Sequence, residues 1–423
     1  MISSQYHTKE GAINEKLALR KLLIYTQSVY QIPQKIKELT DKRKRKQIPF
    51  FNLIMPVFIS LLLQYESFHT VFSAPESMGK RLQHCIRGKI PKVDAVRDAL
   101  SNIEPREVEE IFDSMVAKTY RNAVLRSGTI GGYIAVGIDG VELFSSTKKS
   151  CRTCLTRRSS NGGKEYFHRS VVCATIGESP HLILGQEMLR PRDGSEKDEG
   201  ELTGGKRLVR KLREKYGHFA GVIAADGLYL NAPFINTVLE CHMDAVIRLK
   251  DEKRLIFQDA EKLFEKGEGK QEEVKRGRKR IECWDIAGFE MEGVKEGVRV
   301  VRYCEHMQEK NGKESISWMW LVTTSREIPY KILWKIMHKR WDIEENAFHQ
   351  LKTYYHAKHC YCHEGLDVVF YLMIIAFNIR EMYLYRRIRG FAESGISRKS
   401  VTRKFCDDLQ SEDMSEILYE AGG

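Results

Sequence analysis

Apolar residues in the first 125 positions recur with the period of a helix. They are spaced three or four apart around Leu19 to Tyr30 and again from Val93 to Met115, as on one face of an amphipathic helix. The basic run Lys42 to Lys46 lies between these stretches, and such a run either faces solvent or contacts phosphates. We expect residues 1–125 to form a helical region.

Beyond Gly128 the pattern changes to short apolar runs separated by turn residues. These runs predict strands at 133–138, 169–175, 181–188, 221–225 and 245–249, and helices at 202–216 and 232–243. The second and third strands are close enough along the chain to pair as a hairpin. Strands and helices that alternate in this way predict an α/β fold in which helices cover a central sheet.

Residues 251–317 are polar and highly charged, with short alternating segments such as Val298 to Tyr303. This pattern predicts a mostly β insertion. The α/β pattern resumes with a strand at 318–324 and helices from residue 329. The expected parts are a helical region (1–125), the first part of a core (126–250), the insertion (251–317), the second part of the core (318–390) and a C-terminal tail (391–423).

Two apolar runs raise the question of a membrane span. Residues 48–65 carry no charged side chain, and their length approaches the ~20 residues that cross a bilayer. Because two prolines and two amide side chains interrupt this run, we expect a buried helix there rather than a span. The second run, Val368 to Ile379, is too short to cross.

Composition narrows the class of partner. The chain has 423 residues, of which 42% are hydrophobic, and this excludes a disordered or collagen-like protein. Its formal net charge of +12 favours nucleic acid over a membrane as the partner. Ten cysteines are too few for a disulfide scaffold, and Met1 to His7 lack the basic and apolar regions of a secretory leader. We therefore expect a cytoplasmic protein with reduced thiols.

Three acidic residues stand at positions suited to metal-dependent chemistry. Asp139 and Asp226 each end a predicted strand and precede a glycine, and Glu344 follows Arg340 by four residues on a predicted helix. Each feature alone has an ordinary explanation, because Asp-Gly often forms a turn and an Arg-Glu pair often lies on a surface. Together they favour a site for Mg²⁺ or Mn²⁺, which prefer oxygen ligands. Two such ions activate the attacking oxygen and stabilise the leaving oxygen in phosphodiester displacement.

Three sequence blocks carry a family resemblance. The blocks Gly137 to Gly140, Ala224 to Tyr229 and Arg340 to Glu344 resemble the acidic motifs of bacterial insertion-sequence transposases of the DDE class. The similarity extends over residues 133–385. It is greatest to the insertion-sequence-four-like group, whose signature is Tyr-x2-Arg-x3-Glu-x6-Lys. At two positions the chain departs from that signature, because Met337 replaces the Tyr and the Lys comes one residue late, at Lys352.

The resemblance implies an α/β fold with an RNase H-like catalytic core and a β-rich insertion before the glutamate helix. It also implies that Asp139, Asp226 and Glu344 are the catalytic and metal-binding residues. Arg340 and Lys352 are then expected to contact the DNA backbone.

Two tryptophans are further candidates by the same resemblance. Trp320 is expected to act as a wedge, and Trp341 as a stacking partner, for a base extruded near the end of the element. Both residues are equally compatible with half-buried positions in the core.

Cysteines occur in two groups that are far apart along the chain. Cys151 and Cys154 have the spacing of metal ligands, and Cys360, Cys362 and His363 form the second group. A structural Zn²⁺ needs four ligands that converge, and the second group lacks the spacing of a zinc ribbon. We therefore favour reduced cysteines over a structural Zn²⁺.

The resemblance implies that the activity is cut-and-paste transposition. The enzyme would cut at the ends of the element and join the freed 3′ hydroxyl to target DNA. Its partner would be double-stranded DNA, in the terminal inverted repeats and in the target. The helical region 1–125 would help to bind the ends, and a homodimer would bring two ends together. Three alternatives stay open: an RNase H-like nuclease without strand transfer, a DNA-binding regulator that has lost catalysis, and a zinc-stabilised binding module.

Overall fold

The N-terminal part of the protein is built from helices. The computed structural model describes residue 13 and residues 17–72, 81–82, 84, 88, 91–192, 197–309, 313–414 and 416–417. Met1 to His7, on which the expectation about a leader rests, lie outside the described residues. The helices of this part are α2 (Leu19–Tyr30), α3 (Ile32–Glu38), α4 (Phe51–Leu62), α5 (Phe68–Phe72), α7 (Val93–Ser101) and α8 (Pro105–Arg121).

A ten-stranded mixed sheet forms the centre of the fold. Its strands are β1 (Ala135–Ser146), β2 (Leu155–Arg158), β3 (Lys164–Thr175), β4 (Ile183–Met188), β5 (Val222–Ala225), β6 (Asp244–Arg248), β7 (Val274–Arg276), β8 (Lys279–Phe289), β9 (Val298–Gln308) and β10 (Glu314–Thr323). They run in the order β2-β3-β1-β5-β6-β10-β9-β8-β7, and β4 pairs with β3. The predicted hairpin is confirmed as β3 and β4. β1 is antiparallel to β3 and parallel to β5, which is parallel to β6, and this arrangement is compatible with an RNase H-like core.

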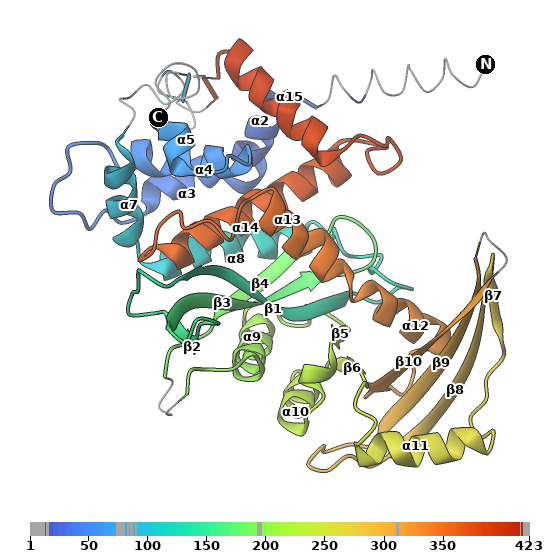
Figure 1. The fold of residues 1–423 in the computed structure, drawn as a ribbon. Coiled ribbons are helices and arrows are strands. Elements are labelled where there is room, and N and C mark those ends of the chain that lie inside the picture. Colours follow the sequence, from blue (N-terminus) through green and yellow to red (C-terminus); the bar gives the residue numbers. More distant parts are fainter. Residues whose placement is uncertain are drawn as a thin grey trace, which may run out of the picture.

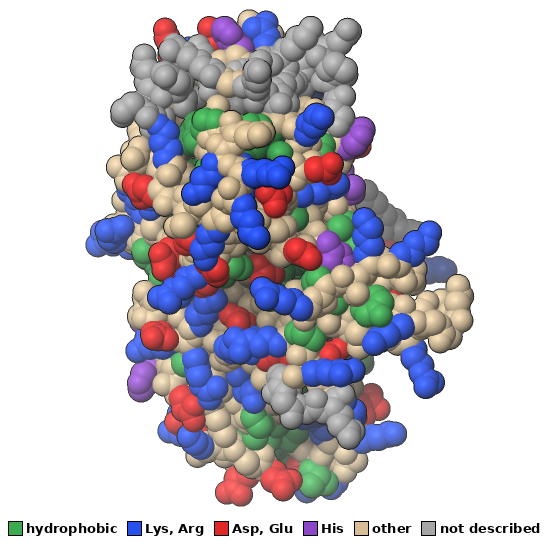
Figure 2. Space-filling model, turned by 90° about the vertical axis from the view of Figure 1, so that its left-hand side faces the viewer, with side chains coloured by type: hydrophobic (Ala, Val, Ile, Leu, Met, Phe, Trp, Pro, Cys, Tyr) green, Lys and Arg blue, Asp and Glu red, His purple; other side chains and the backbone are tan. Residues whose placement is uncertain are grey.

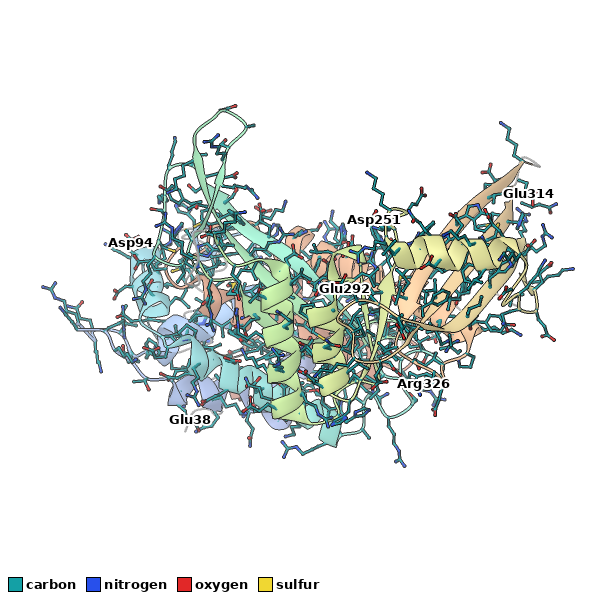
Figure 3. The ribbon with its side chains drawn as sticks, turned by 90° about the horizontal axis from the view of Figure 1, so that it is seen from below. Glu38, Asp94, Asp251, Glu292, Glu314 and Arg326 are labelled. Carbon is teal, nitrogen blue, oxygen red and sulfur yellow. The ribbon has the colours of Figure 1, made fainter. Side chains whose placement is uncertain are left out.

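Helices cover both faces of this sheet (Figure 1). On one face, α9 (Glu201–Tyr216) and α10 (Ala232–Glu240) lie side by side, as Figure 3 shows from below. On the other face lie α8 and α14 (Leu366–Met382), and α14 also packs against α4. The two apolar runs of the sequence are therefore interior helices.

Among the described residues, one helix is long and apolar enough to cross a membrane. It is Leu366–Arg387, which comprises α14 and the π-helical turn after it and is longer than the apolar run at 368–379 suggested. In its most apolar 18 residues, 94% is buried inside the protein. Such burial is typical of the core helix of a globular fold.

The strands of the insertion continue the central sheet. β10 pairs with β9 along its whole length and with β6 from Leu321 to Thr323, so the strand begins at Glu314 and not at residue 318 as predicted. Figure 3 shows Glu314 at the far tip of these strands. The insertion also contains a helix that the sequence analysis missed, α11 (Leu255–Glu265). Charged residues separate the apolar positions of this helix along the sequence, and the apolar residues pack on the strands.

The chain after β10 is helical, and its last described helix packs against the N-terminal region. It contains α12 (Tyr330–Lys339), a π-helical turn (Ile343–Phe348), α13 (His349–Thr353), α14, and α15 (Arg398–Ser411). The backbone N–H of Leu19 donates to Asp408 Oδ2 at 2.9 Å and thereby joins α2 to α15. The predicted C-terminal tail thus includes a helix that packs on the N-terminal region.

Candidate active site

Asp139 and Asp226 lie level on neighbouring parallel strands. In the pairing of β1 with β5, Gly137 stands opposite Ala224, and each aspartate comes two residues later. Asp139 belongs to β1, and Asp226 directly follows β5. Because parallel neighbours in register carry their side chains on the same face, the sheet places the two carboxylates on one face at this end of the strands.

Local hydrogen bonds fix one oxygen of each aspartate. Asp139 Oδ1 accepts the backbone N–H of Gly140 at 2.8 Å. Asp226 Oδ1 accepts the N–H of Leu228 at 2.8 Å and so caps a short 3₁₀ turn, Gly227–Tyr229. Asp226 therefore stands at a turn that orients its carboxylate. Asp139 and Gly140 instead lie inside β1, because the strand continues to Ser146 and does not end at Asp139 as predicted.

Glu344 reaches the same place from the π-helical turn Ile343–Phe348, here called the glutamate turn. Both terminal nitrogens of Arg340 lie 3.1 Å from Glu344 Oε1, and Arg340 Nη1 also lies 3.8 Å from Asp139 Oδ2. Arg340 is only 8% exposed. Its guanidinium thus lies between the two acids. π-Helical turns occur frequently at functional sites.

Two anchors hold the glutamate turn against the sheet. The buried carboxylate of Asp342 accepts the N–H of Gly177, in the turn between β3 and β4, at 2.9 Å. The side chain of Ile343 packs on β1 at Gly137, where an added Cβ would lie 3.3 Å from Ile343 Cβ. Gly137 therefore allows the close approach that brings Glu344 toward Asp139.

The pKa of Asp139 is raised by its surroundings. Burial raises the pKa of Asp139 to about 6, against the lowering effect of the bond from Gly140. The neighbouring charges of Glu201 and Glu344 raise it further, and that of Arg340 lowers it. Crowded carboxylates of this kind are relieved when a cation binds between them.

A fourth carboxylate, that of Glu201, belongs to this cluster and was missed in the sequence. Glu201 begins α9, and its carboxylate pairs with Arg169. It lies so close to β1 that a Cβ at Gly140 would be 2.5 Å from Glu201 Oε2. Burial raises the pKa of Glu201, Arg169 lowers it, and the charge of Asp226 raises it. Glu201 carries no motif of its own, so the fold was needed to find it.

Tyr229 lies close to the acidic cluster. Its ring is fully buried, and its hydroxyl has no hydrogen-bond partner among the described residues. Burial raises the pKa of this hydroxyl, and the charges of Glu201, Asp139 and Asp226 raise it further.

Lys352 lies on α13, close to the acidic cluster. Burial and the charge of Lys358 lower its pKa, whereas the charges of Asp139 and Glu344 raise it. Its ammonium also lies 5.6 Å from the centre of the Phe348 ring. Met337, which replaces the signature Tyr, is buried in α12.

The two tryptophans have different surroundings. Trp320 is 8% exposed and stacks on Phe257 of α11 with ring centres 4.2 Å apart. It therefore occupies the core position that the sequence left open as an alternative. Trp341 is 50% exposed. With Glu344, Glu345 and His349 it lines an open pocket of about 450 Å³.

The structure brings the first cysteine pair together with two histidines. The ligand atoms of Cys151, Cys154, His168 and His363 all lie within 4.8 Å of one another. The second cysteine group contributes its histidine to this cluster and neither of its cysteines. Spacing in the sequence gave no sign that β3 would supply the remaining ligand.

The fold agrees with a comparison to known families. The model of the transposase DDE domain matches residues 146–379, more than half of the chain. The chain therefore belongs to the DDE transposase family. Membership implies a metal-dependent enzyme with DNA as its substrate. No curated protein matches the sequence.

Proposed function

We propose that the protein is the transposase of an insertion sequence, which cuts DNA at the ends of its element and joins the 3′ hydroxyl to target DNA. Family membership supports transposase activity. The observation that carries the site is the placement of Asp139 level with Asp226 on adjacent strands, with Glu344 linked to Asp139 through Arg340. The proposal includes membership of the insertion-sequence-four-like group and the roles that its signature residues imply.

The acidic cluster fits divalent cations. Asp139, Asp226 and Glu344 would hold Mg²⁺ or Mn²⁺, and Glu201 would lie beside them. Burial and the charges of Glu201 and Glu344 raise the pKa of Asp139, and a bound cation would relieve both effects. When bound, such ions activate the attacking oxygen and stabilise the leaving oxygen.

The chain's own residues position these groups. Arg340 holds Glu344 through both terminal nitrogens, and Asp342 ties the glutamate turn to the β3–β4 turn. Lys352, beside the same carboxylates, would neutralise a phosphate of the cleaved strand. We assign Arg340 mainly to positioning because it is buried, and contact with the DNA backbone stays a prediction.

Several surface features support DNA as the partner. Figure 2 shows Lys and Arg side chains spread over one face of the molecule, with acidic groups among them. In the basic run, Arg43 is buried against Asp41, whereas Lys44, Arg45 and Lys46 are exposed and free to meet phosphates.

The exposed ring of Trp341 beside the open pocket supports its proposed stacking on an extruded base. Trp320 would need to leave its stack on Phe257 before it could act as a wedge. A homodimer on DNA, which would bring two element ends together, is also proposed.

The test supplies purified protein with Mg²⁺, a labelled element end and a target duplex. Products in which the end is joined to the target support the proposal, whereas hydrolysis alone supports the nuclease alternative. Asp139→Asn and Glu344→Gln should each lower cleavage by about 10³-fold or more, while gel-shift binding of the end is retained. Asp94→Asn, a matched change at an exposed carboxylate on α7, should leave cleavage unchanged. An unchanged cleavage rate in Asp139→Asn would reject the assigned site.

A further inference from the structure

Four metal-ligating side chains from three separate segments meet away from the carboxylates. Cys151 and Cys154 lie in the connection between β1 and β2, His168 lies on β3, and His363 lies just before α14. Their Sγ and ring nitrogen atoms all lie within 4.8 Å of one another. Cys154 and His168 are buried, with 6% and 4% exposure.

The contacts within this cluster match the edges of a coordination tetrahedron. Cys154 Sγ lies 3.5 Å from Cys151 Sγ, 3.3 Å from His168 Nε2 and 3.3 Å from His363 Nε2. Cys151 Sγ lies 3.5 Å from His168 Nε2. A tetrahedral Zn²⁺ with two sulfur and two nitrogen ligands has edges of about 3.3–3.8 Å, given its bond lengths of ~2.3 and ~2.0 Å. Four of the six ligand–ligand distances therefore agree with these edges, and the other two are within 4.8 Å, so an ion fits at the centre after small shifts of the ligands.

Hydrogen bonds alone satisfy the cluster poorly. Each thiol offers one weakly donated proton and is a weak acceptor, yet Cys154 Sγ contacts three other ligand atoms.

We propose that Cys151, Cys154, His168 and His363 form a structural Zn²⁺ site. Two thiolates and two imidazoles in a tetrahedron suit Zn²⁺ and not Mg²⁺, which prefers oxygen ligands. On binding, the two thiol protons pass to solvent. The backbone N–H of Cys151 donates to Cys154 Sγ at 3.3 Å, which stabilises the thiolate. With four protein ligands the site is closed, so its role is structural.

A bound Zn²⁺ would link the segment that carries Glu344 to the sheet. His363 follows α13, which continues the glutamate turn, while the other ligands belong to β3 and the β1–β2 connection. The ring of His363 already contacts Phe144 of β1, with ring centres 5.2 Å apart and nearly perpendicular planes. Zn²⁺ would thus join the strand that carries Asp139 to the chain that follows Glu344. The inference does not depend on the proposed reaction.

The test measures metal directly in full-length protein purified without chelators. Elemental analysis by inductively coupled plasma mass spectrometry should find one zinc ion per chain. Replacement of zinc by Co²⁺ should give the visible bands of a tetrahedral site with thiolate ligands. Cys154→Ala and His363→Ala should each lose the metal. Cys360→Ala removes a thiol near the cluster that is not a proposed ligand, so this control should retain it.

A second measurement covers ligand variants that fail to fold. Wild-type protein stripped by a chelator should melt at a lower temperature, and Zn²⁺ but not Mg²⁺ should restore the original value. The proposal is overturned if the wild-type protein holds no stoichiometric zinc and gives no Co²⁺ bands. It is also overturned if Cys360→Ala loses the metal as Cys154→Ala does. Neither readout requires DNA cleavage, so failure here is distinct from failure of the proposed function.

Discussion

Both terminal nitrogens of Arg340 lie 3.1 Å from Glu344 Oε1, one turn further along the chain. The same guanidinium lies 3.8 Å from Asp139 Oδ2. Arg340 therefore couples the glutamate turn to β1 and offsets part of the acidic charge. The spacing in the sequence predicted the Arg-Glu pair, and the fold adds its contact with a second carboxylate.

Arg340→Lys tests this positioning role. Lysine keeps the charge but lacks the planar fork that holds Glu344, so we expect the cleavage rate to fall about tenfold or more. Binding of the element end, measured by gel shift over a range of salt concentrations, should keep its salt dependence. A shallower salt dependence, corresponding to about one fewer counterion released on binding, would show that Arg340 contacts a phosphate.

Gly140→Ala tests the role of Glu201 without changing any charge. The new Cβ would fall 2.5 Å from Glu201 Oε2 and push that carboxylate away. We expect Gly140→Ala and Glu201→Gln to lower Mg²⁺-dependent cleavage by similar factors. The double variant should be no worse than the single ones, since both remove the same interaction.

Gly163→Ala is the matched control for this comparison, because nothing lies within 4 Å of an added Cβ there. It should cleave at the wild-type rate. Full activity in Glu201→Gln would exclude Glu201 from the site.

Glu305 ties the insertion to the helix before the active site. On β9, it accepts hydrogen bonds from Trp334 Nε1 at 3.0 Å and contacts His338 Nε2 at 2.5 Å, both on α12. Burial raises its pKa, but the bond and charge of His338, the Trp334 bond and the charge of Lys279 outweigh burial and lower it to about 2.

The stabilisation from Glu305 should therefore depend on pH. A carboxyl whose pKa is lower in the folded protein stabilises the fold above its unfolded pKa of 4.5, and this is lost as the pH falls toward 2. We expect Glu305→Gln to lower the free energy of unfolding by about 2 kcal/mol near neutral pH. The gap to wild type should shrink through this acidic window in denaturant titrations. A gap that stays constant with pH would contradict the assignment.

The two tryptophans should separate stability from DNA contact. Trp320→Ala removes a ring packed on Phe257 and should lower the free energy of unfolding by about 3–5 kcal/mol. Trp341→Ala, at an exposed position, should change it by less than about 0.5 kcal/mol.

In the Trp341→Ala variant, the fluorescence of a 2-aminopurine base placed near the element end should show that this base no longer stacks on an aromatic ring. Trp341→Phe should restore the signal, since any aromatic face stacks. An unaltered signal in Trp341→Ala would remove this residue from the DNA interface.

Local patterns predicted the parts of the core whose burial is set by their own sequence. β5 is apolar throughout, and β6, β3 and β4 each contain a short apolar run, so the sequence predicts them as strands without tertiary information. The register of parallel strands then places Asp139 level with Asp226 on the same face of the sheet. α11 escaped because its apolar stripe is diluted by charged residues that face solvent.

Other features depend on contacts between distant segments. His363 meets Cys154 from 209 positions further along the chain, and no spacing rule predicts such convergence. Glu201 joins the acidic cluster because Gly140 leaves room for it, which only the packing of α9 on β1 reveals. Trp320 is buried by α11, the helix that the sequence analysis had not found.

The most direct test of the central claim is diffraction from crystals grown with Mn²⁺, recorded where manganese scatters anomalously. We predict manganese peaks among the carboxylates of Asp139, Asp226 and Glu344, and their loss in Asp139→Asn. Manganese absent from this cluster at saturating concentration, in crystals of protein that cleaves its DNA, would contradict the account.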